Sequence, residues 1–316
     1  MINTASASIS DIRFAGMLLD VLKQRWAGAL GGAPAPGSPL ERDLHASPNF
    51  ASARLPDPFS QSWAFSQTLG LVATNHEAIL RESLLNYASS QTFTLPVTVV
   101  TTLARVILET LSVQAWLIEP TVDSRGRLAR WMALEFRSER AAWTTLHPGV
   151  AHMNNPIMQQ LVGDADALGI HRDPKTSPEW IGVNPPRSTT LAGKLLQRYS
   201  AYANTGLIGD ETTGERFYRL FSGEMHGTVG SVLQLLLATG TISKGGHPVH
   251  AYGLTHGALW RAVSIVLMST FAARCVYADW LGFPVDAETR RLHTHHVGVV
   301  IQKLAQTERG RASPGE

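Results

Sequence analysis

The sequence contains a single cysteine, Cys275, among 316 residues. One thiol cannot form an internal disulfide, and it excludes a zinc site built from several cysteines. Charged residues are also scarce at 16%, and 27 basic against 25 acidic side chains leave a formal charge of +2. This balance predicts no strong nucleic-acid or anionic-membrane footprint for the chain as a whole. Because the apolar class reaches 44%, wholesale disorder is excluded as well.

Long apolar runs are also lacking. The most apolar stretch extends from Ala262 to Ala273 between two arginines, and as a helix it rises only about 18 Å, too little to cross a bilayer. The first residues lack the basic segment and apolar run of a secretory signal. We therefore expect a soluble, cytoplasmic protein without a membrane partner, in which this stretch forms a buried helix.

Apolar residues recur at helical spacing in every long segment, which predicts an all-α protein. The main domain, residues 60–306, is expected to be a bundle of about six to eight helices. Residues 1–59 are expected to hold an appended N-terminal helix over 9–30 and then a linker rich in proline and glycine, with no helical pattern as far as Pro58. Residues 307–316 are expected to form a flexible tail.

Three segments require a more specific prediction. The β-branched stretch Thr92–Thr102 would favour a strand, but Pro96 is better suited to the first turn of a helix running to Ile118. A helix from Glu215 is expected to continue to about Leu237, and a long apolar helix is expected over 252–281. On the helix that starts at Arg125, the outer face is expected to carry Arg127, Arg130, Arg137, Glu139 and Arg140.

A charge pair stands out in the apolar segment between Ser83 and Ile118, whose charged residues are Arg105 and Glu109 alone. These two residues are one turn apart and share a helix face. Because burying an unpaired charge is very costly, each is predicted to be paired. Two interpretations remain open: a self-contained structural ion pair, or a pair that orients a group on a neighbouring helix.

A second helix is expected to carry a polar stripe, consisting of Tyr218, Arg219, Ser222 and His226. Positions 218, 222 and 226 are spaced by four, and Arg219 lies two turns before His226, so all four share nearly one face. The stripe is interpreted either as a structural polar seam or as a functional site. Buried polar groups find each other because nothing else in a core satisfies them, so we predict at least one contact from Arg105 or Glu109 to this stripe.

The spacing of Arg219 and His226 resembles the Arg-x(4–6)-His motif of the HEPN superfamily. Those proteins are helical bundles, and many are metal-independent ribonucleases of toxin and antiviral systems. The resemblance implies that His226 is the acid or base and that Arg219 stabilises the phosphate, roles that suit the pKa of histidine and the fixed donors of arginine. Glu109 and Arg105 would then orient that pair, with Tyr218 and Ser222 as binding residues. It also implies a homodimer, because the two residues from two protomers converge in HEPN ribonucleases, and an RNA substrate.

A longer resemblance covers roughly Leu95 to Leu237. The run Tyr-Arg-Leu-Phe-Ser-x-x-x-His-Gly from Tyr218, together with Arg105-x-x-x-Glu109 and the segment Trp116–Pro120, resembles a family of uncharacterised actinobacterial all-helical proteins. This resemblance implies the fold and no particular activity.

Histidines gather in two places, 247, 250 and 256 in one and 293, 295 and 296 in the other. A zinc site could be assembled from them in three dimensions, but no spacing matches a known ligand pattern. We therefore interpret them as solvated surface histidines and predict neither a metal nor a cofactor. Two function hypotheses remain: a non-catalytic regulatory or partner-binding protein with a buried polar network, or a HEPN-like metal-independent ribonuclease.

Overall fold

The structure is a computed structural model, and it describes residues 7–26, 33–51, 56–90, 97–151, 154–170, 183–206, 208–225, 236–244, 247–283 and 285–312. Within these ranges the chain forms ten α-helices, a short 3-10 helix and one two-stranded hairpin. The predicted all-α helical bundle is confirmed.

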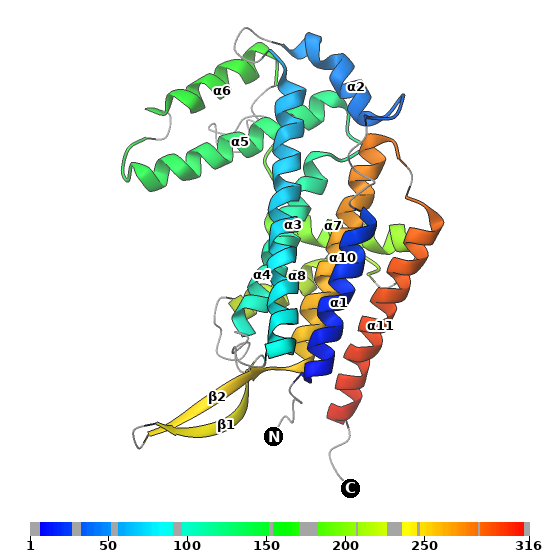
Figure 1. Ribbon diagram of the computed structural model, residues 1–316. Helices are drawn as coiled ribbons and strands as arrows, with labels where there is room; N and C mark the ends of the chain where they lie inside the picture. The colour runs from blue at the N-terminus through cyan, green and yellow to red at the C-terminus, as the bar shows by residue number, and fades with distance from the viewer. Residues whose placement is uncertain are drawn as a thin grey trace.

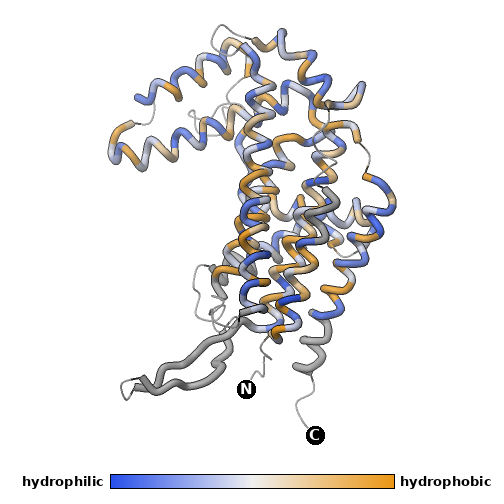
Figure 2. Tube along the Cα trace, viewed as in Figure 1, coloured by the Kyte–Doolittle hydropathy of each residue, from blue (hydrophilic) through white to orange (hydrophobic). Residues whose placement is uncertain are grey.

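Five helices run along the long axis of the molecule (Figure 1): α1 (Ile9–Trp26), α3 (Pro58–Ser90), α4 (Val97–Leu117), α10 (His256–Leu281) and α11 (Ala287–Ala312). Almost every residue of α10 is buried, because this helix packs against α4, α11, α7 and α1. Hydrophobic residues recur along these helices (Figure 2), as expected of elements that share one core. The expectation that Thr92–Thr102 leads into a helix is confirmed from Val97 onward, and residues 91–96 lie outside the described ranges.

Helices α7 (Ser188–Ala203) and α8 (Glu211–Met225) form a close pair that packs against α4. Two glycines face each other where they cross: a Cβ atom on Gly214 would lie 2.6 Å from the carbonyl oxygen of Gly193. No side chain fits in that space, so glycine is required for the two backbones to approach so closely. This contact holds α8 on α7, and both helices pack against α4, where α8 places Tyr218.

The N-terminal region is more ordered than expected. Helix α1 contributes Ile12, Ala15 and Leu19 to the common core. The segment from 31 to 58, predicted to lack helical structure, contains α2 (Pro39–Ala46) and a 3-10 helix at Ser47–Phe50. Ser38 caps α2 by accepting a hydrogen bond from the amide of Glu41 at 3.1 Å, and proline occupies the first helical position. Two turns are too short for a periodic apolar pattern, which explains the wrong prediction.

The region between α8 and α10 also differs from the expectation. Helix α8 is described as far as Met225, and residues 226–235 lie outside the described ranges. The predicted helix does not reach Leu237, because β1 (Leu236–Lys244) pairs antiparallel with β2 (His247–Leu254). The long helix begins at His256 and not at Tyr252, because Thr255 caps it by accepting from the amide of Ala258 at 3.1 Å. The hairpin projects from one end of the bundle (Figure 1), where local β-propensity is not overridden by helix packing.

Two further helices, α5 (Ser124–Leu146) and α6 (Pro156–Ala167), pack against each other at the opposite end of the molecule (Figure 1). The first half of α5 is buried, including Leu128, Trp131 and Phe136. Its last turns project into solvent, and Leu146 is 72% exposed.

Candidate functional site

The predicted contact between the two polar helices is confirmed. Nε of Arg105 donates a hydrogen bond to Oε1 of Glu109 at 2.8 Å, and Nη2 donates to the hydroxyl of Tyr218 at 3.3 Å. The Tyr218 hydroxyl in turn donates to Oε1 of Glu109. The guanidinium carbon also lies 5.6 Å from the centre of the Tyr218 ring, a cation–π distance. We call these three residues the α4–α8 network.

The charges of the α4–α8 network satisfy one another. Burial, with the carboxylate of Glu109 beside it, raises the pKa of Tyr218, so this phenol stays protonated at neutral pH. Burial alone would lower the pKa of Arg105, but the hydrogen bond and charge of Glu109 outweigh it, and the pKa is raised. The carboxylate of Glu109, the third member, accepts hydrogen bonds from both the phenol and the guanidinium, which agrees with a structural role for the network.

The other members of the polar stripe do not join this network in the described part of the chain. The side chain of Arg219 is 69% exposed and pairs with Glu215, one turn earlier on α8, at 3.1 Å. Ser222 belongs to α8, but its side chain is not among those that the structure describes. His226 lies outside the described residues. The proposed couple of Arg219 and His226 therefore stays a prediction.

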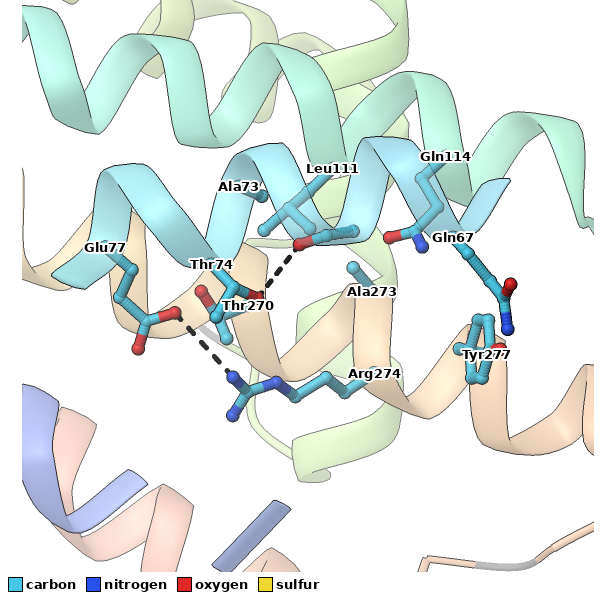
Figure 3. Close-up of a pocket in the computed structure, with 11 residues that line it drawn as sticks. Gln67, Ala73, Thr74, Glu77, Leu111, Gln114, Thr270, Ala273, Arg274 and Tyr277 are labelled. Carbon is cyan, nitrogen blue, oxygen red and sulfur yellow. Dashed lines mark hydrogen bonds and ion pairs between the residues drawn. The ribbon is translucent and has the colours of Figure 1, made fainter. Parts of the chain in front are cut away.

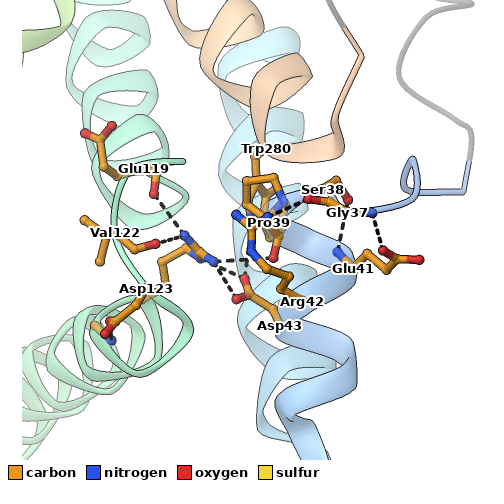
Figure 4. Close-up of polar contacts among 12 residues, drawn as sticks. Gly37, Ser38, Pro39, Glu41, Arg42, Asp43, Glu119, Val122, Asp123 and Trp280 are labelled. Carbon is orange, nitrogen blue, oxygen red and sulfur yellow. Dashed lines mark hydrogen bonds and ion pairs between the residues drawn. The ribbon is translucent and has the colours of Figure 1, made fainter.

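A fully buried ion pair connects α2 to α5 (Figure 4). Nε and Nη2 of Arg127 donate to the two carboxylate oxygens of Asp43 at 2.7 and 2.6 Å, and both side chains are at most 3% exposed. Nη1 of Arg127 also donates to the carbonyl oxygens of Glu119 and Val122. Trp280 completes the set by donating from Nε1 to Asp43 at 3.3 Å. We call the pair of Asp43 and Arg127 the α2–α5 latch.

The latch corrects the prediction for α5. Arg127 and Arg130 were both expected on an outer face, but Arg127 is buried and Arg130 is half-buried, donating to the carbonyl oxygen of Trp116 and lying 4.9 Å from the centre of its ring. Burial, with the charge of Arg127 nearby, lowers the pKa of Arg130 to about 10. The sequence pattern was misleading because α2, which covers this face, was not predicted.

A cavity of about 230 Å³ lies between α3, α4 and α10 (Figure 3). We call it the α3–α10 cavity. One part of its wall is apolar and another carries charged, amide and hydroxyl groups. The lining residues are Gln67, Gly70, Ala73, Thr74, Glu77, Leu111, Gln114, Thr270, Ala273, Arg274 and Tyr277.

One end of the α3–α10 cavity is charged. Nη2 of Arg274 lies 3.7 Å from Oε2 of Glu77, within ion-pair range but beyond hydrogen-bond length. Burial lowers the pKa of Arg274, and the charge of Glu77 opposes this effect. Thr270 lies near this end (Figure 3) and is 4% exposed, and its hydroxyl has no hydrogen-bond partner among the described residues. An unsatisfied buried hydroxyl is uncommon and marks a place where a further polar partner fits.

The other end carries amide groups. Nε2 of Gln114 donates to the carbonyl oxygen of Ser66 at 2.9 Å. A Cβ atom on Gly70 would lie 2.8 Å from that nitrogen, so glycine keeps the place open for the Gln114 amide. Tyr277, at the same end, accepts a hydrogen bond from Nε1 of Trp63 at 3.4 Å. The polar lining is thus held in position by neighbouring groups.

The histidines do not assemble a metal site in the part of the chain that the structure describes, where no group of three or more metal-ligand side chains comes together. His293 corrects the expectation of surface histidines: it is 2% exposed and stacks on Phe271, with ring centres 4.1 Å apart. Burial, with the charges of His296 and Arg274 nearby, lowers the pKa of His293 to about 3. His295 is exposed, and His256 lies 3.4 Å from the carboxylate of Asp11.

Comparisons with protein-family models, with curated proteins and with solved structures found no match to this chain. Among the described residues one helix, α10, is long and apolar enough to cross a membrane, and 89% of its most apolar window is buried inside the protein. Burial of this kind is typical of a core helix.

The α3–α10 cavity could not be predicted from the sequence pattern. Arg274 stands at the end of an apolar run, and Glu77 lies within an amphipathic helix like many surface glutamates. A charged residue that ends the most apolar helix of a chain was the available signal, because such a residue needs a partner inside the core.

Proposed function

We propose that the protein is a non-catalytic helical regulator that binds a small organic molecule in the α3–α10 cavity. The observation that carries this proposal is the composition of the cavity wall, where Ala73, Leu111 and Ala273 lie beside a few fixed polar groups. Ligand pockets combine apolar walls with a small number of placed polar groups in this way. An apolar cavity of about 150 Å³ accepts benzene, so about 230 Å³ suits a somewhat larger molecule.

Two observations support a non-catalytic role. The α4–α8 network is satisfied within itself, and in the cavity the charged groups of Glu77 and Arg274 face each other. In both arrangements the charged groups are engaged with one another, as is usual for structural ion pairs: the carboxylate of Glu109 accepts from Arg105 and Tyr218, and that of Glu77 faces Arg274.

A regulatory role is supported by the position of the cavity. Its wall consists of residues from α3, α4 and α10, so an occupant contacts three helices of the core at once. A ligand that binds one arrangement of these helices better than another shifts the population toward it. Helix α4 also carries the α4–α8 network, which provides a route from the cavity to α8.

The second candidate function is the HEPN-like ribonuclease, and the observation that favours it is the exposure of Arg219 on α8. An exposed guanidinium is accessible to an RNA phosphate. This candidate requires His226 nearby and a homodimer, and it involves a different face of the protein from the cavity.

A fragment screen by ligand-observed NMR tests the proposed function. We expect the parent protein to bind some neutral or charged fragments of up to about 12 non-hydrogen atoms. The variant Ala273→Leu, which adds three carbons to the cavity wall, should lose these fragments. The matched control Ala141→Leu changes an exposed position on α5 and should keep them. Fragments that bind equally to Ala273→Leu, or a screen without any binding, would overturn the proposal.

A further inference from the structure

We infer that the occupant of the α3–α10 cavity is a small zwitterion, whose carboxylate binds Arg274 and whose ammonium group binds Glu77. This inference rests on the proposed function, because it names the chemical class of the ligand at the same site. It follows from the charge balance at one end of the cavity, from an unsatisfied hydroxyl and from the shape of the wall.

The charge balance favours a ligand without net charge. Glu77 is 6% exposed and Arg274 carries a side chain that is 13% exposed, so the two charges together make a neutral, largely desolvated pair. An added anion or cation would leave one uncompensated charge in the core, which costs much more than a paired one. A zwitterion brings one charge of each sign, so the site stays neutral after it binds.

The distance between the two side chains leaves room for a ligand to contact both of them. At 3.7 Å, the contact between Nη2 of Arg274 and Oε2 of Glu77 is longer than a charge-assisted hydrogen bond, which is typically about 2.8 Å. A ligand carboxylate can take the planar guanidinium in a bidentate contact, and an ammonium group can donate to the carboxylate of Glu77. A zwitterion can thereby contact both side chains at once.

Thr270 supplies a third contact. Its hydroxyl is buried and has no hydrogen-bond partner among the described residues, and Figure 3 places this residue next to Thr74, at the charged end. The hydroxyl can donate to a carboxylate oxygen of the ligand, which removes the cost of leaving a buried donor unsatisfied. A neutral hydrocarbon would leave this hydroxyl without a hydrogen-bond partner.

The rest of the wall indicates an elongated body. Glu77 and Gln67 are ten residues apart on α3, and a helix covers that distance in about 15 Å. Figure 3 shows these residues at opposite ends of the cavity, with Ala73, Leu111 and Ala273 between them. An unbranched aliphatic chain fits this arrangement, so an α-amino acid with a straight apolar side chain is the representative ligand.

Isothermal titration calorimetry with three matched probes tests the inference. L-norleucine has both charges, pentylamine lacks its carboxylate, and hexanoate lacks its amine. We expect norleucine to bind at least about tenfold more tightly than either of the others, since each of those keeps only one of the two charge-assisted contacts. Equal or tighter binding of pentylamine or hexanoate would overturn the zwitterion assignment.

Variants separate this assignment from the proposed function. The double variant Glu77→Gln/Arg274→Gln keeps the site neutral. It should raise the Kd of norleucine by at least about tenfold, so that norleucine no longer binds more tightly than pentylamine or hexanoate. The matched control Asp11→Asn/Lys303→Gln removes an ion pair between α1 and α11, outside the cavity, and should bind norleucine like the parent. If fragments bind in the cavity and none of the three probes does, the zwitterion class fails while the ligand-binding function stands. If neither fragments nor probes bind, both fail.

Discussion

Tyr218 donates its hydroxyl hydrogen to the same oxygen of Glu109 that accepts a hydrogen bond from Nε of Arg105. One carboxylate oxygen therefore connects two helices that are far apart in the sequence. Arg105 also donates to the Tyr218 hydroxyl, so each of the three side chains is hydrogen-bonded to the other two. This closed set of contacts makes the contribution of each polar atom to stability measurable.

Removal of the Tyr218 hydroxyl tests that contribution. Tyr218→Phe keeps the ring under Arg105 but removes a donor to Glu109, so we expect the free energy of unfolding to fall by about 1–2 kcal/mol. Urea denaturation measures the change. The control is Tyr199→Phe, because the buried hydroxyl of Tyr199 has no hydrogen-bond partner among the described residues, and its loss should be neutral or stabilising. Equal losses in the two variants would contradict a role for the network.

The α2–α5 latch should be far more sensitive. Asp43→Ala leaves the guanidinium of Arg127 buried without a counter-charge, so we expect a loss of about 3–5 kcal/mol in urea denaturation. The double variant Asp43→Leu/Arg127→Met removes both charges and should recover most of that loss. As a control, Arg219→Ala opens the exposed pair with Glu215 and should cost less than about 1 kcal/mol. A double variant as unstable as Asp43→Ala would contradict this account.

His293 should make stability depend on pH. Its pKa is lowered from 6.5 to about 3 in the folded protein, so as the pH falls below 6.5 the unfolded chain binds the proton first. Stability is therefore complete above about pH 6.5 and declines toward pH 3, by about 2 kcal/mol between pH 7 and pH 5. His293→Phe, which keeps a ring against Phe271, should flatten this decline in chemical denaturation. Identical pH profiles for the two proteins would refute the assignment.

The ribonuclease hypothesis has its own test. The proposed function predicts no cleavage of single-stranded RNA by the parent above the level of His226→Ala, measured in EDTA to exclude metal-dependent contaminants. The HEPN-like hypothesis predicts cleavage that both Arg219→Ala and His226→Ala abolish while the melting temperature stays unchanged. Cleavage with that pattern would overturn the non-catalytic proposal and assign the exposed face of α8 to RNA.

The long helices were predicted well because their apolar residues recur at helical spacing over many turns. Helices α3, α4 and α10 each bury a continuous apolar face, and the isolated pair of Arg105 and Glu109 indicated a partner in the core. The stripe of Tyr218, Arg219, Ser222 and His226 could be predicted as the source of that partner, because few polar residues lie on core-facing helices. Tyr218 is the member that makes the contact. In this case the scarcity of charge made the remaining charges informative.

The features that were missed depend on contacts between distant segments. Burial of Arg127 follows from the docking of α2, whose two turns carry no periodic pattern. The α3–α10 cavity requires the register of three helices against one another, which spacing within one helix does not determine. The hairpin of β1 and β2 occupies most of the segment that was predicted as a break between two helices, and its pairing joins residues as far apart as Leu236 and Leu254, which spacing within one helix does not reveal.

The α2–α5 latch also has a consequence for the order of events during synthesis. Asp43 contacts Arg127, 84 residues later, and Trp280, 237 residues later. At about 5–20 residues per second, a ribosome needs about 10–50 s to add the segment that ends in Trp280. During that interval α2 has left the exit tunnel of the ribosome, but Trp280 has not yet been made. The N-terminal helices therefore lack one of their native contacts. The pairing of α2 with α5 can therefore precede the contact with Trp280, which is completed only when the last third of the chain has been made.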